Sequence, residues 1–213
     1  QLDYHGELYS LMNYRAEWAT SPPPRIYAGA TFEKMARMAG AVADGTMVSD
    51  APLGRMPQIM GWLRAGLDSA GRRREDFRVN NFMAWHVKRD RAASVAEARR
   101  EMIWRGFLLP WFTEPFLGAE MARFVEQKKP AFLKAFFARS AEIEGVPEPV
   151  LEQLVQHLAL AGDLGDIERI AAHVHAMGEA GLDEVALRLH DEPEEGLRLI
   201  GEHLLPALGI APR

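Results

Sequence analysis

The sequence predicts an α/β fold in which about four parallel strands alternate with helices, interrupted by one long helical segment. Short apolar runs of strand length recur between stretches with helical apolar spacing, which is typical of βα units. Between residues 111 and 160 the pattern changes: phenylalanines recur at helical spacing, and prolines interrupt the segment. With 213 residues, 48% of them hydrophobic, the chain is long enough for one sizeable core. The strands then form either a small open doubly wound sheet or half of a barrel.

The first strand is predicted over Ile26–Gly29, a short apolar run that follows the stiff Pro22–Pro24. Before it, the segment to about Ser21 carries scattered aromatic residues without a convincing period. After it, Thr31 is expected to cap a helix, and a second strand covers residues 46–49. The aromatic residues are Tyr4, Tyr9, Tyr14 and Trp18, and the apolar stripe of the helix is Met35, Met38, Ala39 and Val42.

A second helix is expected to begin near Pro57, because proline suits the first turn of a helix. A third strand follows over residues 79–87. Ser94 and Glu97 then match the S-x-x-E capping box, which predicts a helix from there to about Pro110. The expected C-terminal cap of the second helix is Gly71, and its inward residues are Met60, Leu63 and Leu67.

The segment 111–160 is expected to be an all-helical insertion, since it shows no further βα unit. The alternation then returns. Asp163 is predicted to cap a helix that Gly181 ends, a fourth strand covers residues 185–189, and Pro193 opens the last helix. These elements give a single domain over residues 1–213.

Composition and charge exclude several classes of function. The formal net charge of −5 provides no basic surface, so we expect no nucleic-acid partner. There is no cysteine, hence no disulfide, thiolate metal site or cysteine nucleophile. No apolar run approaches the ~20 residues that span a bilayer, and no signal sequence begins the chain, so we expect a cytoplasmic protein without a membrane partner. Position 1 is Gln rather than Met, which indicates a processed or trimmed chain.

Several stretches match one family in order and spacing. Pro23–Ala30 followed by Lys34–Gly45 is similar to the pattern P-P-(I/V)-Y-(V/I)-(A/G)-(A/G), then K-(M/L)-x-x-(L/M)-A-G-x-x-A-D-G. This pattern belongs to the luciferase-like flavin monooxygenase superfamily, and more narrowly to its deazaflavin-dependent branch, which includes methylenetetrahydromethanopterin reductase. The resemblance covers about residues 20–90 and 155–210. Its other motifs are Ala70–Phe77, Ala161–Asp163, Ala180–Val185 and Pro193–Leu208.

The resemblance implies a (β/α)8 TIM-barrel-like fold, of which this chain carries only the C-terminal half of about four strands plus the helical insertion. It also implies a flavin- or F420-dependent oxidoreductase or monooxygenase, with coenzyme F420 or FMN as cofactor and a small molecule as substrate. A flavin reductase is one candidate electron donor, and we expect a homodimer. The resemblance also implies that the first four strands or so, which supply much of the flavin-ring pocket and the active-site residues in relatives, have no matching position in this sequence.

The candidate cofactor contacts are Gly29, Ala30 and Thr31, between the first strand and the first helix. A small residue lets the backbone approach a ligand closely, and free N–H groups at a helix N-terminus attract an anion. In deazaflavin relatives the equivalent loop holds the cofactor phosphate, so the resemblance makes these three residues cofactor contacts. An ordinary tight βα turn remains the alternative interpretation.

The candidate substrate-binding residues are Ser49, Asp50 and His190. Ser49 and Asp50 close the second strand and His190 follows the fourth, on the C-terminal face where barrel active sites lie. A turn that caps the next helix is equally compatible with Ser49 and Asp50. His86, at the end of the third strand, could point either way. No metal site is expected, because His173 and His175 are two residues apart and face different sides of a helix.

Two other functions remain open from the sequence. One is a non-catalytic α/β interaction module that uses the aromatic segment 111–160 as its partner surface. The other is a phosphate-binding barrel enzyme that binds a phosphorylated sugar at Gly29–Thr31 and does not use flavin. Binding of a flavin or deazaflavin distinguishes the flavin- or F420-dependent oxidoreductase from both of these alternatives.

Overall fold

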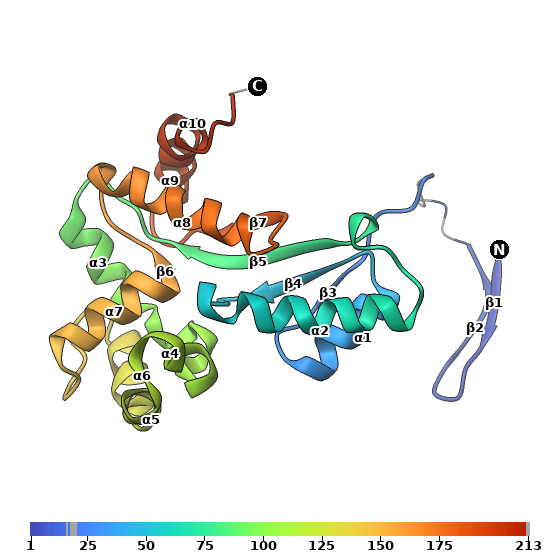
Figure 1. Ribbon diagram of the computed structural model, residues 1–213, viewed down its shortest axis with the longest axis horizontal. Coiled ribbons are helices and arrows are strands. Elements are labelled where there is room, and N and C mark those ends of the chain that lie inside the picture. The colour runs from blue at the N-terminus through green and yellow to red at the C-terminus, as the bar shows by residue number, and fades with distance from the viewer. Residues whose placement is uncertain (16, 18–20, 212–213) are drawn as a thin grey trace.

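The computed structural model describes residues 1–15, 17 and 21–211. Its centre is a sheet of five parallel strands, in the order β3-β4-β5-β6, with β7 also paired to β5 (Figure 1). The parallel sheet and its flanking helices confirm the predicted α/β class. The strands are β3 (Tyr27–Gly29), β4 (Gly45–Ser49), β5 (Arg78–Trp85), β6 (Ala159–Leu160) and β7 (Glu184–Arg188).

The sheet has one strand more than the sequence predicts. β6 lies at the end of the segment expected to be all helical and pairs with Ala84 and Trp85 of β5. A strand of two residues has no alternation that a sequence pattern could reveal. The prediction of a helical insertion up to residue 160 is therefore wrong at its C-terminal end.

A second small sheet lies near the N-terminus, where the sequence showed no period. β1 (Leu2–His5) and β2 (Ser10–Tyr14) form an antiparallel hairpin, and every residue of both strands is exposed. In Figure 1 the hairpin projects away from the parallel sheet and its helices. Because neither face is buried, the hairpin carries no alternation of apolar and polar residues. Trp18 lies outside the described residues.

Helices α1 (Glu33–Val42) and α2 (Met56–Ser69) lie side by side against the sheet (Figure 1). The predicted inward stripe of α1 is largely wrong, because Met35, Met38 and Val42 are exposed. The buried residues of this helix are small ones: Ala36, Ala39 and Gly40.

The reason is the close approach of the two helices. A Cβ atom added to Gly40 would lie 2.5 Å from the Leu63 carbonyl oxygen, and one added to Gly66 would lie 2.1 Å from the Arg37 carbonyl oxygen. Only small residues fit between backbones at this distance, so the larger apolar side chains of α1 point outward. The prediction for α2 is confirmed: Pro57 lies in its first turn, its inward residues are buried, and Gly71 follows it with a φ of +63°.

Between β5 and β6 the chain forms five α-helices with a core of their own. The predicted capping box at Ser94 and Glu97 is wrong, since the helix begins earlier and the Asp90 carboxylate accepts a hydrogen bond from the Ala92 N–H at 2.9 Å. Ser94 and Glu97 are instead buried inside that helix, which ends well before Pro110. The helices are α3 (Arg91–Arg100), α4 (Pro110–Leu117), α5 (Ala119–Gln127), α6 (Lys129–Phe137) and α7 (Glu148–Leu158).

The C-terminal part follows the prediction closely. Asp163 and Asp166 form a reciprocal capping box ahead of α8, Gly181 follows this helix with a φ of +106°, and Pro193 begins α9. No helix in the described residues combines the length and apolar character needed to cross a membrane. The helices are α8 (Ile167–Glu179), α9 (Pro193–Leu199) and α10 (Leu205–Ala207), with a π-helical turn over Ile200–Leu204 between the last two.

The two faces of the sheet differ in character. Outward residues of β4 and β5, such as Val48, Val79 and Met83, pack under the helices in the main core. The opposite face is more polar: the Tyr27 hydroxyl donates to the Glu184 carboxylate at 3.0 Å. Since side chains alternate along a strand, Phe82 and His86 of the β5 segment and Arg188 of β7 belong to this second face as well.

Candidate functional site

A cavity of about 390 Å³, here called the mouth pocket, opens at the C-terminal ends of the strands. Parallel strands bring their carboxyl ends to one edge of the sheet, which is where barrel enzymes bind their ligands. The loops after β3 and β4, strands β5 and β7, and the segment between α3 and α4 all contribute. The lining residues are Thr31, Phe32, Ser49, Asp50, Phe82, Trp104, Arg105, Gly106, Phe107, Leu109, Phe112 and Arg188.

A buried ion pair forms one wall of the mouth pocket. The Asp50 carboxylate accepts a hydrogen bond from the Arg105 guanidinium at 2.7 Å and another from the Gly106 N–H at 3.1 Å. Arg105 is 2% exposed and Asp50 9%. Burial raises the pKa of Asp50 and lowers the pKa of Arg105, and the charge of each partner opposes the shift in the other. Each charge is therefore tolerated in this wall because the other is present.

The segment held by Asp50 is strained. Gly106, Phe107 and Leu108 have φ values of +55°, +50° and +50°, so three consecutive residues are left-handed. For a residue other than glycine this conformation costs roughly 1–2 kcal/mol. The turn leaves Phe107 58% exposed at the rim of the pocket, with its ring edge-on to Trp104. Strain of this kind persists only where surrounding contacts impose it, and here Asp50 supplies two of them.

Of the three predicted cofactor contacts, only Thr31 lines the mouth pocket. Gly29 is exposed, and a Cβ atom added there would meet nothing within 4 Å. Ala30 is buried and its N–H donates to the Met47 carbonyl at 3.0 Å, so this N–H is not free for a ligand. The predicted cap is also wrong: the N-cap of α1 is Phe32, which makes no side-chain cap hydrogen bond. The N-terminus of α1 thus lies beside the pocket without a side-chain cap.

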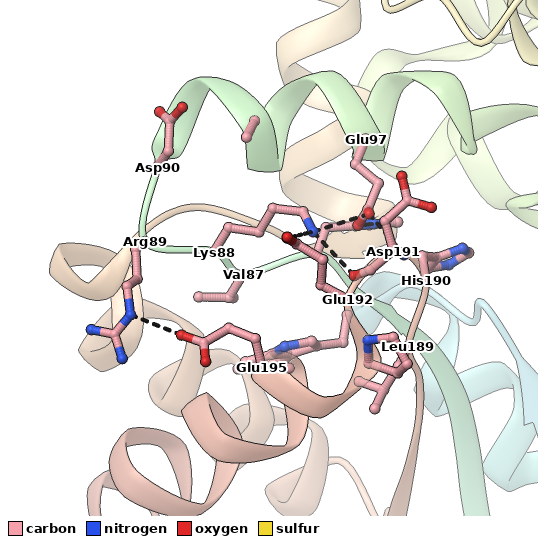
Figure 2. Close-up of a pocket in the computed structure, with 15 residues that line it drawn as sticks. Val87, Lys88, Arg89, Asp90, Glu97, Leu189, His190, Asp191, Glu192 and Glu195 are labelled. Carbon is pink, nitrogen blue, oxygen red and sulfur yellow. Dashed lines mark hydrogen bonds and ion pairs between the residues drawn. The ribbon is translucent and has the colours of Figure 1, made fainter.

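The predicted substrate-binding residues separate into two groups. Ser49 and Asp50 line the mouth pocket, where the Asp50 carboxylate is occupied by Arg105 and Gly106. His190 lies instead in a neighbouring cavity of about 280 Å³, here called the histidine pocket (Figure 2). It opens between the β5–α3 and β7–α9 connections. Its lining includes Trp85, His86, Val87, Lys88, Arg89, Asp90, Ala93, Glu97, Leu189, His190, Asp191, Glu192, Pro193, Glu195 and Gly196.

Glu97 organises the histidine pocket. Its carboxylate lies 2.7 Å from His86 Nδ1 and 3.2 Å from the Lys88 ammonium, and it accepts a hydrogen bond from the Asp191 N–H at 3.0 Å. On the other side of the cavity Arg89 pairs with Glu195 at 2.8 Å (Figure 2). Glu97 is 4% exposed, and these donors lower its pKa against the effect of burial.

The His86 and His190 rings are stacked, with centroids 4.5 Å apart. The Nε2 atoms of both rings are buried and have no hydrogen-bond partner among the described residues. Burial, together with the neighbouring His86, Arg105 and Arg188, lowers the pKa of His190 to about 3. Burial also lowers the pKa of His86, although Glu97 opposes this. In both rings burial thus disfavours the protonated form.

Sequence reasoning missed this stack as well as Arg105 and Arg188. In the sheet Ala84 pairs with Arg188, so two residues further on each chain His86 comes opposite His190. Side-chain alternation along the two strands could have placed both histidines on one face, but the β5–β7 register that brings them opposite each other could not be read from the sequence. The other histidine pair is unrelated: His173 is half-buried and His175 exposed. No group of three or more metal-ligating side chains occurs within residues 1–15, 17 and 21–211.

A family model for luciferase-like monooxygenases matches residues 1–184. The chain belongs to this family. Membership confirms the predicted superfamily and assigns the chain to a family of oxidoreductases and monooxygenases. A sequence comparison with curated proteins found no match.

Solved structures agree with membership of the luciferase-like family. One is the coenzyme F420-dependent tetrahydromethanopterin reductase from Methanopyrus kandleri, with a TM-score of 0.75 and 17% identity, over 97% of this chain and 58% of that one. Another is an F420-dependent secondary alcohol dehydrogenase, with a TM-score of 0.67 and 15% identity, over 97% and 56%.

A third similar structure is the oxygenating constituent of 3,6-diketocamphane monooxygenase from Pseudomonas putida, in complex with FMN. It has a TM-score of 0.54 and 18% identity, over 100% of this chain and 59% of that one. At these identities the likeness establishes the fold: the parallel sheet corresponds to part of a luciferase-like TIM barrel. The chain spans less than two thirds of the length of each of these structures.

Proposed function

We propose that the chain belongs to a flavin- or F420-dependent oxidoreductase, and that coenzyme F420 or FMN binds at the mouth pocket. The observation that carries the proposal is the combination of aromatic walls with an uncapped helix N-terminus at the strand ends. Two of the similar structures are described as F420-dependent and one as an FMN complex, so both cofactors are candidates.

The walls of the mouth pocket fit a planar ring. Phe32, Phe82, Trp104 and Phe112 offer aromatic surfaces, and Phe32 packs edge-on against Phe112 with ring centroids 6.2 Å apart. The volume of about 390 Å³ lies in the range of small-molecule sites. These residues would hold the ring by stacking and would exclude water from one side of it.

The loop after β3 fits an anionic group. The open space at Gly29 and the uncapped start of α1 at Thr31 and Phe32 leave room and favourable dipole for a phosphate. We therefore propose Gly29, Ala30 and Thr31 as cofactor contacts, with Ala30 acting through the shape of the loop because its own N–H is bonded.

When bound, the cofactor supplies hydride transfer or oxygen activation, and the protein supplies binding and orientation. The Asp50–Arg105 pair holds the strained wall of the pocket in place. Ser49, which lines the cavity, would offer a hydrogen-bonding group to a small-molecule substrate, with His190 acting from the neighbouring pocket. A homodimer and a flavin reductase as electron donor remain part of this proposal.

Titration with FMN and with coenzyme F420, followed by fluorescence, tests the proposal. Gly29→Val places a side chain in the open space where the phosphate would lie, and should weaken binding at least tenfold while leaving the fold intact. Gly61→Ala is the matched control, because a Cβ atom there also meets nothing within 4 Å but lies on α2. Absence of binding by both cofactors, or equal binding by both variants, contradicts the proposal.

A further inference from the structure

Arg188 differs from the other arginines around the strand ends. Arg105 pairs with Asp50 at 2.7 Å, and Arg100 and Arg139 pair with Asp191 at 2.9 and 3.2 Å. Arg188 lines the mouth pocket, and its guanidinium makes no hydrogen bond or ion pair with the described residues. An exposed cation at the end of a strand is thus left without a carboxylate, although carboxylates are close by.

The nearby carboxylates cannot serve Arg188, because each is already engaged. Both oxygens of Asp50 accept hydrogen bonds from Arg105 and Gly106. Glu101 accepts from Arg100 at 3.0 Å. The positive charge of Arg188 also reaches the pocket wall: it opposes the rise that burial causes in the pKa of Asp50, and it adds to the fall that burial causes in the pKa of Arg105 and of His190. The mouth pocket therefore carries one positive charge that the described residues do not balance.

We propose that Arg188 binds an oxyanion, a carboxylate, sulfonate or phosphate, on an aromatic or otherwise apolar substrate that occupies the mouth pocket. The inference rests on the proposed function for the role of this pocket and names its substrate class. A guanidinium presents a planar fork of donors that matches such an oxyanion with two hydrogen bonds. Phe82 and Phe107 provide the apolar surface for the remainder of the molecule.

The mouth pocket has two places where an anionic group could bind, one for the cofactor and one for the substrate. The start of α1, beside Thr31, is the proposed site of the cofactor phosphate, whereas Arg188 comes from β7. Since β4 and β5 lie between β3 and β7 in the sheet, the two places are on different sides of the pocket. Arg188 is thereby left for the substrate.

The experiment uses the 213-residue chain and follows tryptophan fluorescence, because Trp104 lines the pocket. Benzoate and benzenesulfonate are the anionic probes, and benzamide is the neutral counterpart. Arg188→Gln should weaken binding of both anions at least tenfold and leave benzamide unchanged, and Arg188→Lys should recover only part of the loss. Arg64→Gln, at an exposed arginine of α2 outside both pockets, is the matched control and should behave as the wild type. Equal anion affinity in the Arg188→Gln and Arg64→Gln variants overturns the inference.

Two further arms separate the sources of the oxyanion and the two proposals. If Arg188→Gln weakens FMN but neither riboflavin nor benzoate, the residue binds the cofactor phosphate, and the substrate assignment is overturned. If neither FMN nor coenzyme F420 binds while benzoate binding still depends on Arg188, the proposed cofactor fails and the anion site stands.

Discussion

The mouth pocket and the histidine pocket lie at the same strand ends but differ in whether their charged side chains are all paired. In the mouth pocket Arg105 is neutralised by Asp50, whereas Arg188 remains unpaired beside aromatic side chains. In the histidine pocket the Glu97 carboxylate contacts His86, Lys88 and a backbone N–H, so it is fully paired within the protein. The mouth pocket therefore keeps a charged group free to bind a ligand, whereas Glu97 mainly joins α3 to the strand ends.

The largest effect should come from breaking the ion pair of the mouth pocket. Asp50→Ala leaves the buried Arg105 without its partner and releases the left-handed turn at Gly106. Loss of one partner of a buried pair typically destabilises by about 3–5 kcal/mol. Denaturant unfolding monitored by circular dichroism measures the change in the free energy of unfolding.

Asp50→Asn is the control for this substitution. The amide oxygen can still accept from one of the two donors, so the loss of stability should be clearly smaller than for alanine. Should both variants be as stable as the wild type, the ion pair would not anchor the pocket wall, and the contrast between the two pockets would lose its basis.

A smaller effect is expected from the histidine pocket. Glu97→Gln keeps the size of the side chain but removes the charge that faces His86 and Lys88. Because one buried donor is left poorly paired, the free energy of unfolding should fall by about 1–3 kcal/mol. Anion and cofactor binding at the mouth pocket should stay unchanged, and a parallel loss of binding would show that the two pockets act as one site.

The stacked histidines predict a dependence of stability on pH. The pKa of His190 is about 3 in the folded protein, against 6.5 in the absence of its surroundings. Below pH 6.5 the unfolded chain therefore binds a proton at this residue that the folded chain does not. His190 leaves the free energy of unfolding unaffected above pH 6.5 and lowers it progressively as the pH falls toward 3. The groups that face His190 include His86, Arg105, Arg188, Glu97 and Glu101.

His190→Phe keeps an aromatic ring in the stack and removes the titrating group. Its unfolding free energy should vary less with pH than that of the wild type between pH 6.5 and 4, while His175→Gln, at an exposed position, should follow the wild type. Parallel pH curves for the wild type and His190→Phe would mean that His190 is protonated at its ordinary pKa.

Most of the fold could be predicted because its signals are local. Strands β4 and β5, helix α2 and the Asp163 cap rest on apolar runs and on capping residues near in sequence. The inward face of α1 could not be predicted, since it depends on how closely α2 approaches at Gly40. The two-residue strand β6 carries no period at all.

The candidate site was predictable in position but not in its contacts. Thr31, Ser49 and Asp50 line the mouth pocket because residues that follow parallel strands meet at one edge. The partner of Asp50 is Arg105, 55 residues further along the chain, directly before a left-handed segment that no local pattern indicates. His190 lies at the predicted edge but faces the neighbouring cavity, because the β5–β7 register stacks it on His86.

The smallest change in stability is expected for Arg188→Gln, and this is the most informative difference between the pockets. An exposed side chain without an ion pair among the described residues contributes little to folding, so the free energy of unfolding should change by no more than about 0.5 kcal/mol. A substitution that leaves folding intact and removes anion binding is the behaviour of a residue retained for a ligand. A loss of stability above 1 kcal/mol would instead mean that Arg188, like Glu97, mainly stabilises the fold.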